Sequence, residues 1–131
     1  MINIVIDTNV LVSAALSSSG ISAKIISLIS SSDEIQVFYS AEIISEYKRV
    51  LAYDKLKIPV VVQAIIVEAL EEFGQLVNPP ASTMPMPDES DRTFYDTARL
   101  AKAILITGNL RHYPSEPFIM SPADFLQRIG E

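Results

Sequence analysis

Four acidic residues stand where strand–helix units would bring them to one edge of a sheet. Asp7 directly follows the apolar run Ile2–Ile6, Glu46 lies on a helical stretch after a second strand, and Asp91 and Asp96 precede a later strand. In open α/β sheets, ligands bind at the carboxyl ends of the strands. Acids grouped without a basic partner are difficult to maintain unless a cation neutralises them. The pattern therefore predicts a metal site, with Asp96 ranked after the other three.

The residue types favour a hard divalent cation. The chain has no cysteine and a single histidine, His112, which excludes thiolate and histidine-rich zinc sites and favours Mg²⁺ or Mn²⁺. Such ions can activate a water and stabilise the leaving oxygen of a phosphodiester. Thr8, Asn9 and Thr107 are expected to orient the acids. If Asp96 faces water, Asn109 must act as a neutral ligand or position the water.

Each acid also has a purely structural interpretation. The alternatives are a helix cap for Asp7, an ion pair of Glu46 with Arg49 or Lys48, a helix N-terminus for Asp91, and an ion pair of Asp96 with Arg92 or Arg99. Taken singly, these interpretations are favoured, because structural ion pairs outnumber catalytic ones. Taken together they are weaker, since they do not explain why the acids follow strand ends.

Composition sets further bounds. A chain of 131 residues that is 49% hydrophobic predicts one folded domain over residues 1–131 with a substantial core. No leader-like segment opens the chain, and the most apolar stretch, Ile58–Leu70, is too short to span a bilayer. We expect a cytoplasmic protein with no membrane contact.

The net charge of −6 argues against broad electrostatic attraction to nucleic acid. Basic side chains nevertheless occur in the segments that carry the acids. They form either a local basic rim or ordinary solvated helix faces. These residues are Lys48, Arg49, Arg92, Arg99, Lys102, Arg111 and His112. The sequence leaves both interpretations open.

Strand and helix patterns alternate along the chain. The expected strands are Ile2–Ile6, Ile35–Tyr39, a short edge strand at Gln75–Val77, Ala103–Thr107 and Phe118–Met120. The expected helices are Val10–Leu16, Ile21–Ile29, Ala41–Ala52, Val60–Phe73, Asp91–Lys102 and one from Pro122 to about Ile129.

Local signals refine these elements. Ser40 and Ser90 are expected to cap the helices that follow them, and Val60–Phe73 is expected to be mostly buried. Four prolines place Asn78–Asp88 in a loop. Repeated strand–helix–strand units predict an α/β fold with a mostly parallel sheet and helices on both faces. If the first and fourth strands are neighbours, Asp7 and Asn109 meet.

The segments, taken in order, resemble a PIN domain. The resemblance rests on Ile6-Asp7-Thr8-Asn9-Val10-Leu11, on Ser45-Glu46-Tyr47, on Asp91 to Ala98, and on Ile104 to Asn109. It covers nearly the whole chain. The ending Phe118-Ile119-Met120-Ser121-Pro122 is similar to members of the branch of toxin components of toxin–antitoxin systems.

This resemblance implies a three-layer α/β/α sandwich and a Mg²⁺- or Mn²⁺-dependent ribonuclease similar to VapC toxins. It carries over Asp7, Glu46 and Asp91 as the acidic site. Asn109 stands where the family often has a fourth acid, and Asp96 is a candidate substitute. The resemblance further implies a homodimer and an inhibitory antitoxin. The apolar helix Val60–Leu70 is a candidate for such contacts, with burial in the core as the alternative.

Three functions compete. The first is an endoribonuclease acting on RNA through metal-activated water. The second is a catalytically weak or inactive PIN-fold module that binds RNA or regulates, which the neutral Asn109 and the negative net charge favour. A receiver domain is the third, and it fits poorly because Asn3 replaces an expected acid and no lysine follows Phe118.

Overall fold

The computed structural model describes residues 1–130. Its strands are β1 (Ile2–Ile6), β2 (Ile35–Tyr39), β3 (Gln75–Leu76), β4 (Ile104–Ile106) and β5 (Ile119–Met120). Its α-helices are α1 (Thr8–Leu16), α2 (Ile21–Ser31), α3 (Ala41–Leu51), α4 (Val60–Phe73), α5 (Arg92–Ala101) and α6 (Pro122–Arg128). Three short 3₁₀ turns, η1 (Asp54–Leu56), η2 (Glu89–Asp91) and η3 (Leu110–His112), lie between them.

The five strands form one parallel sheet in the order β3-β2-β1-β4-β5. The chain winds outward from β1 to β3, then crosses back to β4 on the other side of β1. The β1–β4 neighbours are therefore the point at which the winding direction reverses, which is where α/β sheets bind ligands. The first and fourth strands, whose proximity the sequence left as a condition, are neighbours, with Ile6 paired to Ile106.

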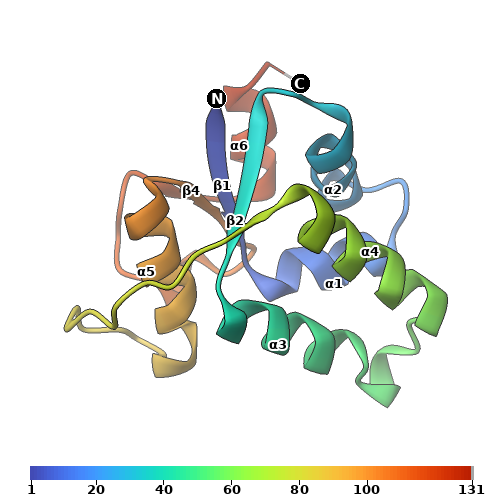
Figure 1. Cartoon of the computed structure of the whole chain (residues 1–131), viewed down its shortest axis with the longest axis horizontal. Coiled ribbons are helices and arrows are strands. Elements are labelled where there is room, and N and C mark those ends of the chain that lie inside the picture. Colours follow the sequence, from blue (N-terminus) through green and yellow to red (C-terminus); the bar gives the residue numbers. More distant parts are fainter. Residues whose placement is uncertain (131) are drawn as a thin grey trace.

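Helices cover both faces of this sheet (Figure 1). Helix α5 contacts β1, β2 and β4, and lies on one side of the strands. Helices α1, α2, α4 and α6 are connected to one another on the other side. The predicted α/β/α sandwich with a parallel sheet is confirmed. Continuous apolar strands such as Ile4–Ile6, which are fully buried, follow from this double coverage.

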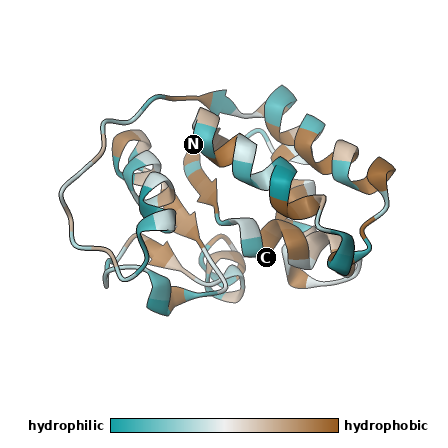
Figure 2. Ribbon diagram, turned by 90° about the horizontal axis from the view of Figure 1, so that it is seen from below, coloured by the Kyte–Doolittle hydropathy of each residue, from teal (hydrophilic) through white to brown (hydrophobic). Residues whose placement is uncertain are grey.

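The prediction that Val60–Phe73 is mostly buried is wrong. Only Ile66, Val67 and Leu70 of α4 are buried, whereas Val60, Val61 and Ile65 are 79%, 65% and 60% exposed. The helix sits at the outside of its layer, so one stripe meets α2 and β2 and the rest faces outward. Figure 2 shows both brown and teal turns along α4.

One of the two predicted serine caps is confirmed and the other is wrong. Ser40 caps α3 by accepting a hydrogen bond from the backbone N–H of Ile43. Ser90 does not cap α5, because it lies within η2, where its own N–H and hydroxyl donate to Asp88. Asp88 therefore caps η2, and the N-cap of α5 is Asp91, whose side chain makes no cap hydrogen bond. Asp7 stands at the N-cap position of α1 yet forms no cap hydrogen bond with its side chain.

Among residues 1–130, no single helix has both the length and the apolar composition needed to cross a bilayer. Helices α1 and α2 reach those criteria only when taken together, and they are bent by 103° relative to each other.

Candidate metal centre

Asp7 lies at the carboxyl end of β1, beside the end of β4. Its backbone N–H donates to Ile106 O at 2.9 Å, which fixes it to β4. Three side chains donate to Asp7 Oδ2: Thr107 Oγ1 at 2.8 Å, Tyr113 O–H at 3.0 Å and Asn9 Nδ2 at 3.2 Å. Burial raises the pKa of Asp7, and the bonds from Thr107 and Tyr113 oppose that rise. The surrounding donors thus hold a carboxylate in a position that burial alone would disfavour.

Glu46 projects from α3 toward the same strand end. The hydroxyl of Thr8 donates to Glu46 Oε2, and Arg49 Nη2 lies 3.8 Å from Oε1. The ion pair proposed as an alternative role for Glu46 is therefore present. Its other oxygen is nevertheless tied to the residue that follows Asp7, and the Glu46 charge contributes to the raised pKa of Asp91. Glu46 thus lies within electrostatic reach of the other acids.

Asp91 ends η2 and is 8% exposed. Burial, followed by the charges of Asp7 and Asp88, raises its pKa to about 6, while His112 acts in the opposite direction. Its Oδ2 atom is buried and accepts no hydrogen bond, although Nδ1 of His112 lies 3.3 Å away. A carboxylate kept beside other carboxylates with an unsatisfied oxygen is costly unless something else binds that oxygen.

The segment after β4 supplies two side chains whose roles the sequence did not indicate. Tyr113, 4% exposed, reaches back 106 residues to donate to Asp7. Burial and the neighbouring Asp7 charge raise the pKa of Tyr113, so its hydroxyl stays a donor. His112 stood out in the sequence only as a basic residue, and it lies beside Asp91. A tyrosine next to a lone histidine after a strand end was the only available signal.

The four predicted supporting residues form a network around Asp7. Asn9 Oδ1 accepts from the Gly108 N–H at 2.9 Å, and Thr107 Oγ1 accepts from the Asn109 N–H at 2.9 Å. Thr8 joins the network through Glu46. Asn109 is exposed, and the hydrogen bond that connects it to the site is the one from its backbone N–H to Thr107.

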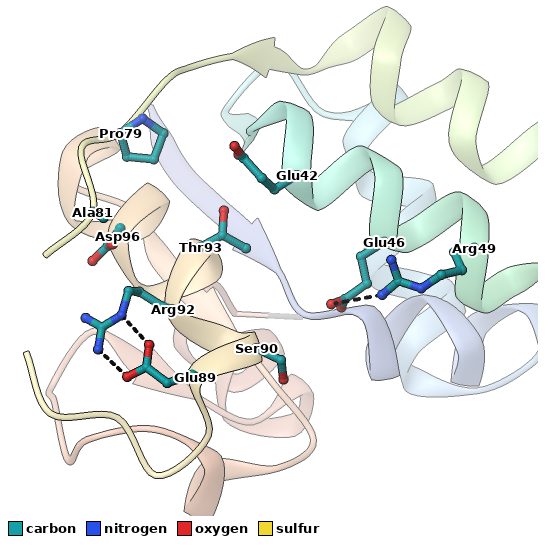
Figure 3. A pocket seen from close by; sticks show the side chains of 10 residues that line it. All are labelled: Glu42, Glu46, Arg49, Pro79, Ala81, Glu89, Ser90, Arg92, Thr93 and Asp96. Atoms are coloured by element: carbon teal, nitrogen blue, oxygen red, sulfur yellow. Dashed lines mark hydrogen bonds and ion pairs between the residues drawn. The ribbon is translucent and has the colours of Figure 1, made fainter.

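Asp96 lies on α5 on the wall of a neighbouring pocket of about 450 Å³ (Figure 3). Glu46 and Arg49 line the α3 side of this pocket, and Arg92 lines the α5 side. Asp96 is 6% exposed, so it is not the exposed ion-pair partner of the alternative interpretation. Its Oδ2 accepts from the Ser82 N–H at 2.9 Å, which ties α5 to the proline-rich loop. Its Oδ1 is buried and has no hydrogen-bond partner.

The basic residues near the acids are largely paired. Arg92 Nη2 lies 2.6 Å from Glu89 Oε1, Arg49 contacts Glu46, and Lys48 Nζ lies 4.0 Å from Glu71. Figure 3 shows the two arginine pairs on opposite sides of the pocket. In each of these pairs the positive charge is matched by a neighbouring carboxylate.

The acidic side chains at this strand end offer carboxylate oxygens as ligands. The charges of Asp7 and Glu46 both act on the pKa of Asp91. Within residues 1–130, however, the ligand atoms that gather within 4.8 Å of one another belong to Asp88, Asp91 and His112. The unsatisfied Asp91 Oδ2 offers an oxygen with no competing hydrogen bond. Carboxylate oxygens are the ligands that Mg²⁺ and Mn²⁺ prefer, and a cation would relieve the repulsion among them.

Comparison with known proteins places these features in a family. Residues 3–111 match the family described as PIN domain. The chain is similar to the uncharacterized protein MJ1680 of Methanocaldococcus jannaschii, with 33% identity over 111 residues, covering 82% of this chain and 71% of that protein. No solved structure matches the chain significantly.

Proposed function

Because this chain belongs to the PIN domain family, whose members are generally nucleases, we propose that it is a Mg²⁺- or Mn²⁺-dependent endoribonuclease. The observation that carries the proposal is the buried Asp91 Oδ2, which lies among like-charged acids without a hydrogen bond. Such a group calls for a cation, and the family supplies the reaction class. Asp7, Glu46 and Asp91 hold the ion, and Asp96 remains the candidate fourth acid.

The bound ion would supply Lewis acidity toward the phosphodiester and an activated water. The residues of the chain do the rest. Thr107 and Tyr113 fix the orientation of Asp7 through its Oδ2. Glu46, held by Thr8, faces the pocket and either binds the ion or accepts a proton from the attacking water. The pocket between α3 and α5 gives the RNA strand a place beside the acids.

We further propose that the protein is the cytoplasmic toxin of a toxin–antitoxin pair and that an antitoxin inhibits it. In this proposal residues 1–131 fold as one domain, and two copies of the chain associate. The support within this chain is the exposed apolar surface of α4, formed by Val60, Val61 and Ile65. Exposed apolar residues clustered on one helix are typical of surfaces that bind other proteins.

A second function is favoured by two observations. The position after β4 carries the neutral, exposed Asn109, and the chain has a net charge of −6. A weakly active or inactive PIN-fold module that binds RNA or regulates would have both properties. The two functions differ in turnover, which can be measured.

The deciding experiment is cleavage of a labelled single-stranded RNA with Mg²⁺ or Mn²⁺. We expect wild-type cleavage to stop on chelation and to fall at least about a hundredfold in Asp7→Asn, which keeps the shape of the side chain while removing its charge. The matched control is Asp33→Asn, an exposed acid before β2. Equal cleavage by wild type and Asp7→Asn would point to a contaminating nuclease, and no cleavage by the wild type would favour the inactive module.

A further inference from the structure

The turn after β4 brings an imidazole to the edge of the acidic cluster. His112 ends η3, and its Nδ1 lies 3.3 Å from Asp91 Oδ2. Asp88 joins them from the segment before η2, so that one ligand atom from each of the three residues lies within 4.8 Å of the others. The group therefore contains two carboxylates and one nitrogen donor, drawn from two separate stretches of the chain.

The two carboxylates of this group differ in their local contacts. Asp88 Oδ1 takes both hydrogen bonds from Ser90, at 2.8 Å from the hydroxyl and 3.0 Å from the N–H, which fixes the carboxylate in place. Asp91 Oδ2, the oxygen nearest the imidazole, is buried and accepts no hydrogen bond. The His112 side chain is 46% exposed, so the imidazole lies at the surface of the cluster.

Asn109 and Asp96, the two candidates that the sequence offered for the fourth position of the acidic site, make other contacts. Asn109 is exposed, and the hydrogen bond that connects it to the site comes from its backbone N–H to Thr107. Asp96 accepts from Ser82 through Oδ2 and keeps a buried, unpartnered Oδ1, but it is not among the residues whose ligand atoms gather around Asp91. His112 instead has a donor atom that already faces an acid of the cluster.

We propose that His112, together with Asp88, extends the site at Asp91 into a mixed nitrogen–oxygen centre that binds divalent transition-metal ions in preference to Mg²⁺. The proposal rests on the metal-binding part of the proposed function. Imidazole nitrogen suits transition ions such as Co²⁺ and Zn²⁺, whereas Mg²⁺ strongly prefers oxygen ligands. His112 therefore determines which ion the centre selects, in addition to the oxygen ligands that any divalent ion would use.

Calorimetric titration of the metal-free protein with Co²⁺ and separately with Mg²⁺ tests this selectivity. In His112→Ala we expect the affinity for Co²⁺ to fall about tenfold, the scale of losing one metal-supporting group, and that for Mg²⁺ to change less than twofold. Leu110→Ala, an exposed residue in the same turn, is the matched control and should leave both affinities unchanged. An equal loss for the two ions, or no loss for either, would overturn the proposal.

The unmodified protein gives an independent readout because His112 is its only histidine. In protein labelled with ¹⁵N-histidine, titration with Zn²⁺ should shift the Nδ1 resonance, since that nitrogen faces Asp91. An imidazole spectrum that does not move while calorimetry registers Zn²⁺ binding would refute the role of His112 and leave the nuclease proposal standing. Absence of any divalent-ion binding to the wild type would refute both.

Discussion

At the scale of single residues, the carboxyl group of Asp91 links stability to pH. Burial and the nearby Asp7 and Asp88 charges raise its pKa from an ordinary 3.8 to about 6. Between about pH 4 and pH 6 the folded protein therefore binds more protons than the unfolded chain. The free energy of unfolding must fall as the pH rises through that window. Asp7, whose pKa is also raised, adds a change of the same sign.

Asp91→Asn should therefore stabilise the protein where the carboxylate is ionised. In the presence of a chelator, we expect the melting temperature of the variant to exceed that of the wild type by a few degrees at pH 7.5, and to match it at pH 4. Thermal denaturation followed by circular dichroism at both pH values measures this. Asp33→Asn makes the same charge change on an exposed loop and should show no such pH-dependent gain. A destabilised Asp91→Asn at pH 7.5 would contradict the repulsion inferred here.

At the scale of elements, local signals predicted the strands and most helix starts. The run Ile2–Ile6 is continuous because both faces of β1 are covered, and Ser40 caps α3 through its own side chain. Burial of α4 was not predictable in this way, because an apolar composition does not reveal how many sides of a helix have neighbours. The bond from Tyr113 to Asp7 was equally hidden, since it spans 106 residues and depends on the shape of η3.

The junction between α4 and β3 depends on a missing side chain. A Cβ atom at Gly74 would lie 2.4 Å from Leu70 O and 2.7 Å from Tyr39 Cε1, so even alanine forces the backbone or β2 to shift. We expect Gly74→Ala to lower the free energy of unfolding by about 1–3 kcal/mol, the usual cost of overpacking. Urea denaturation measures it.

The matched control for that substitution is Gly20→Ala. A Cβ atom at Gly20 meets Ser17 Oγ at 3.2 Å, and that side chain can rotate away. Because Gly20 precedes α2 as its N-cap, alanine should cost less than about 1 kcal/mol. Equal losses in the two variants would mean that the close approach of α4 to Tyr39 does not limit the residue at position 74.

At the scale of the whole molecule, strand order explains why acids distant in sequence converge. The reversal between β1 and β4 places the ends of both strands side by side. The pocket between α3 and α5 lies next to them, and Glu46 lines it. Sequence reasoning could reach this arrangement only conditionally, because alternating strand and helix patterns do not fix which strands are neighbours. Once β1 and β4 pair, the positions of Asp7 and Thr107 follow.

Helix α4 presents exposed apolar side chains on its outer face. Val61 and Ile65 are 65% and 60% exposed and lie four residues apart, so they share one face of the helix. If two copies associate through this face, the double substitution Val61→Asp and Ile65→Asp should place like charges at the contact and separate the copies. Sedimentation velocity at tens of micromolar protein should then show a dimer for the wild type and a monomer for the variant.

Stability must be measured alongside association. Both residues are exposed in the single chain, so their substitution should not disturb its core. The melting temperature of the double variant should therefore lie within a few degrees of that of the monomeric wild type. Leu100→Asp on α5, at a leucine that is 50% exposed, is the matched control and should leave the dimer intact. Two outcomes would show that copies do not associate through α4: a wild type that sediments as a monomer, or a double variant that remains dimeric. Either outcome would leave the apolar face of α4 available for a different protein, such as the proposed antitoxin.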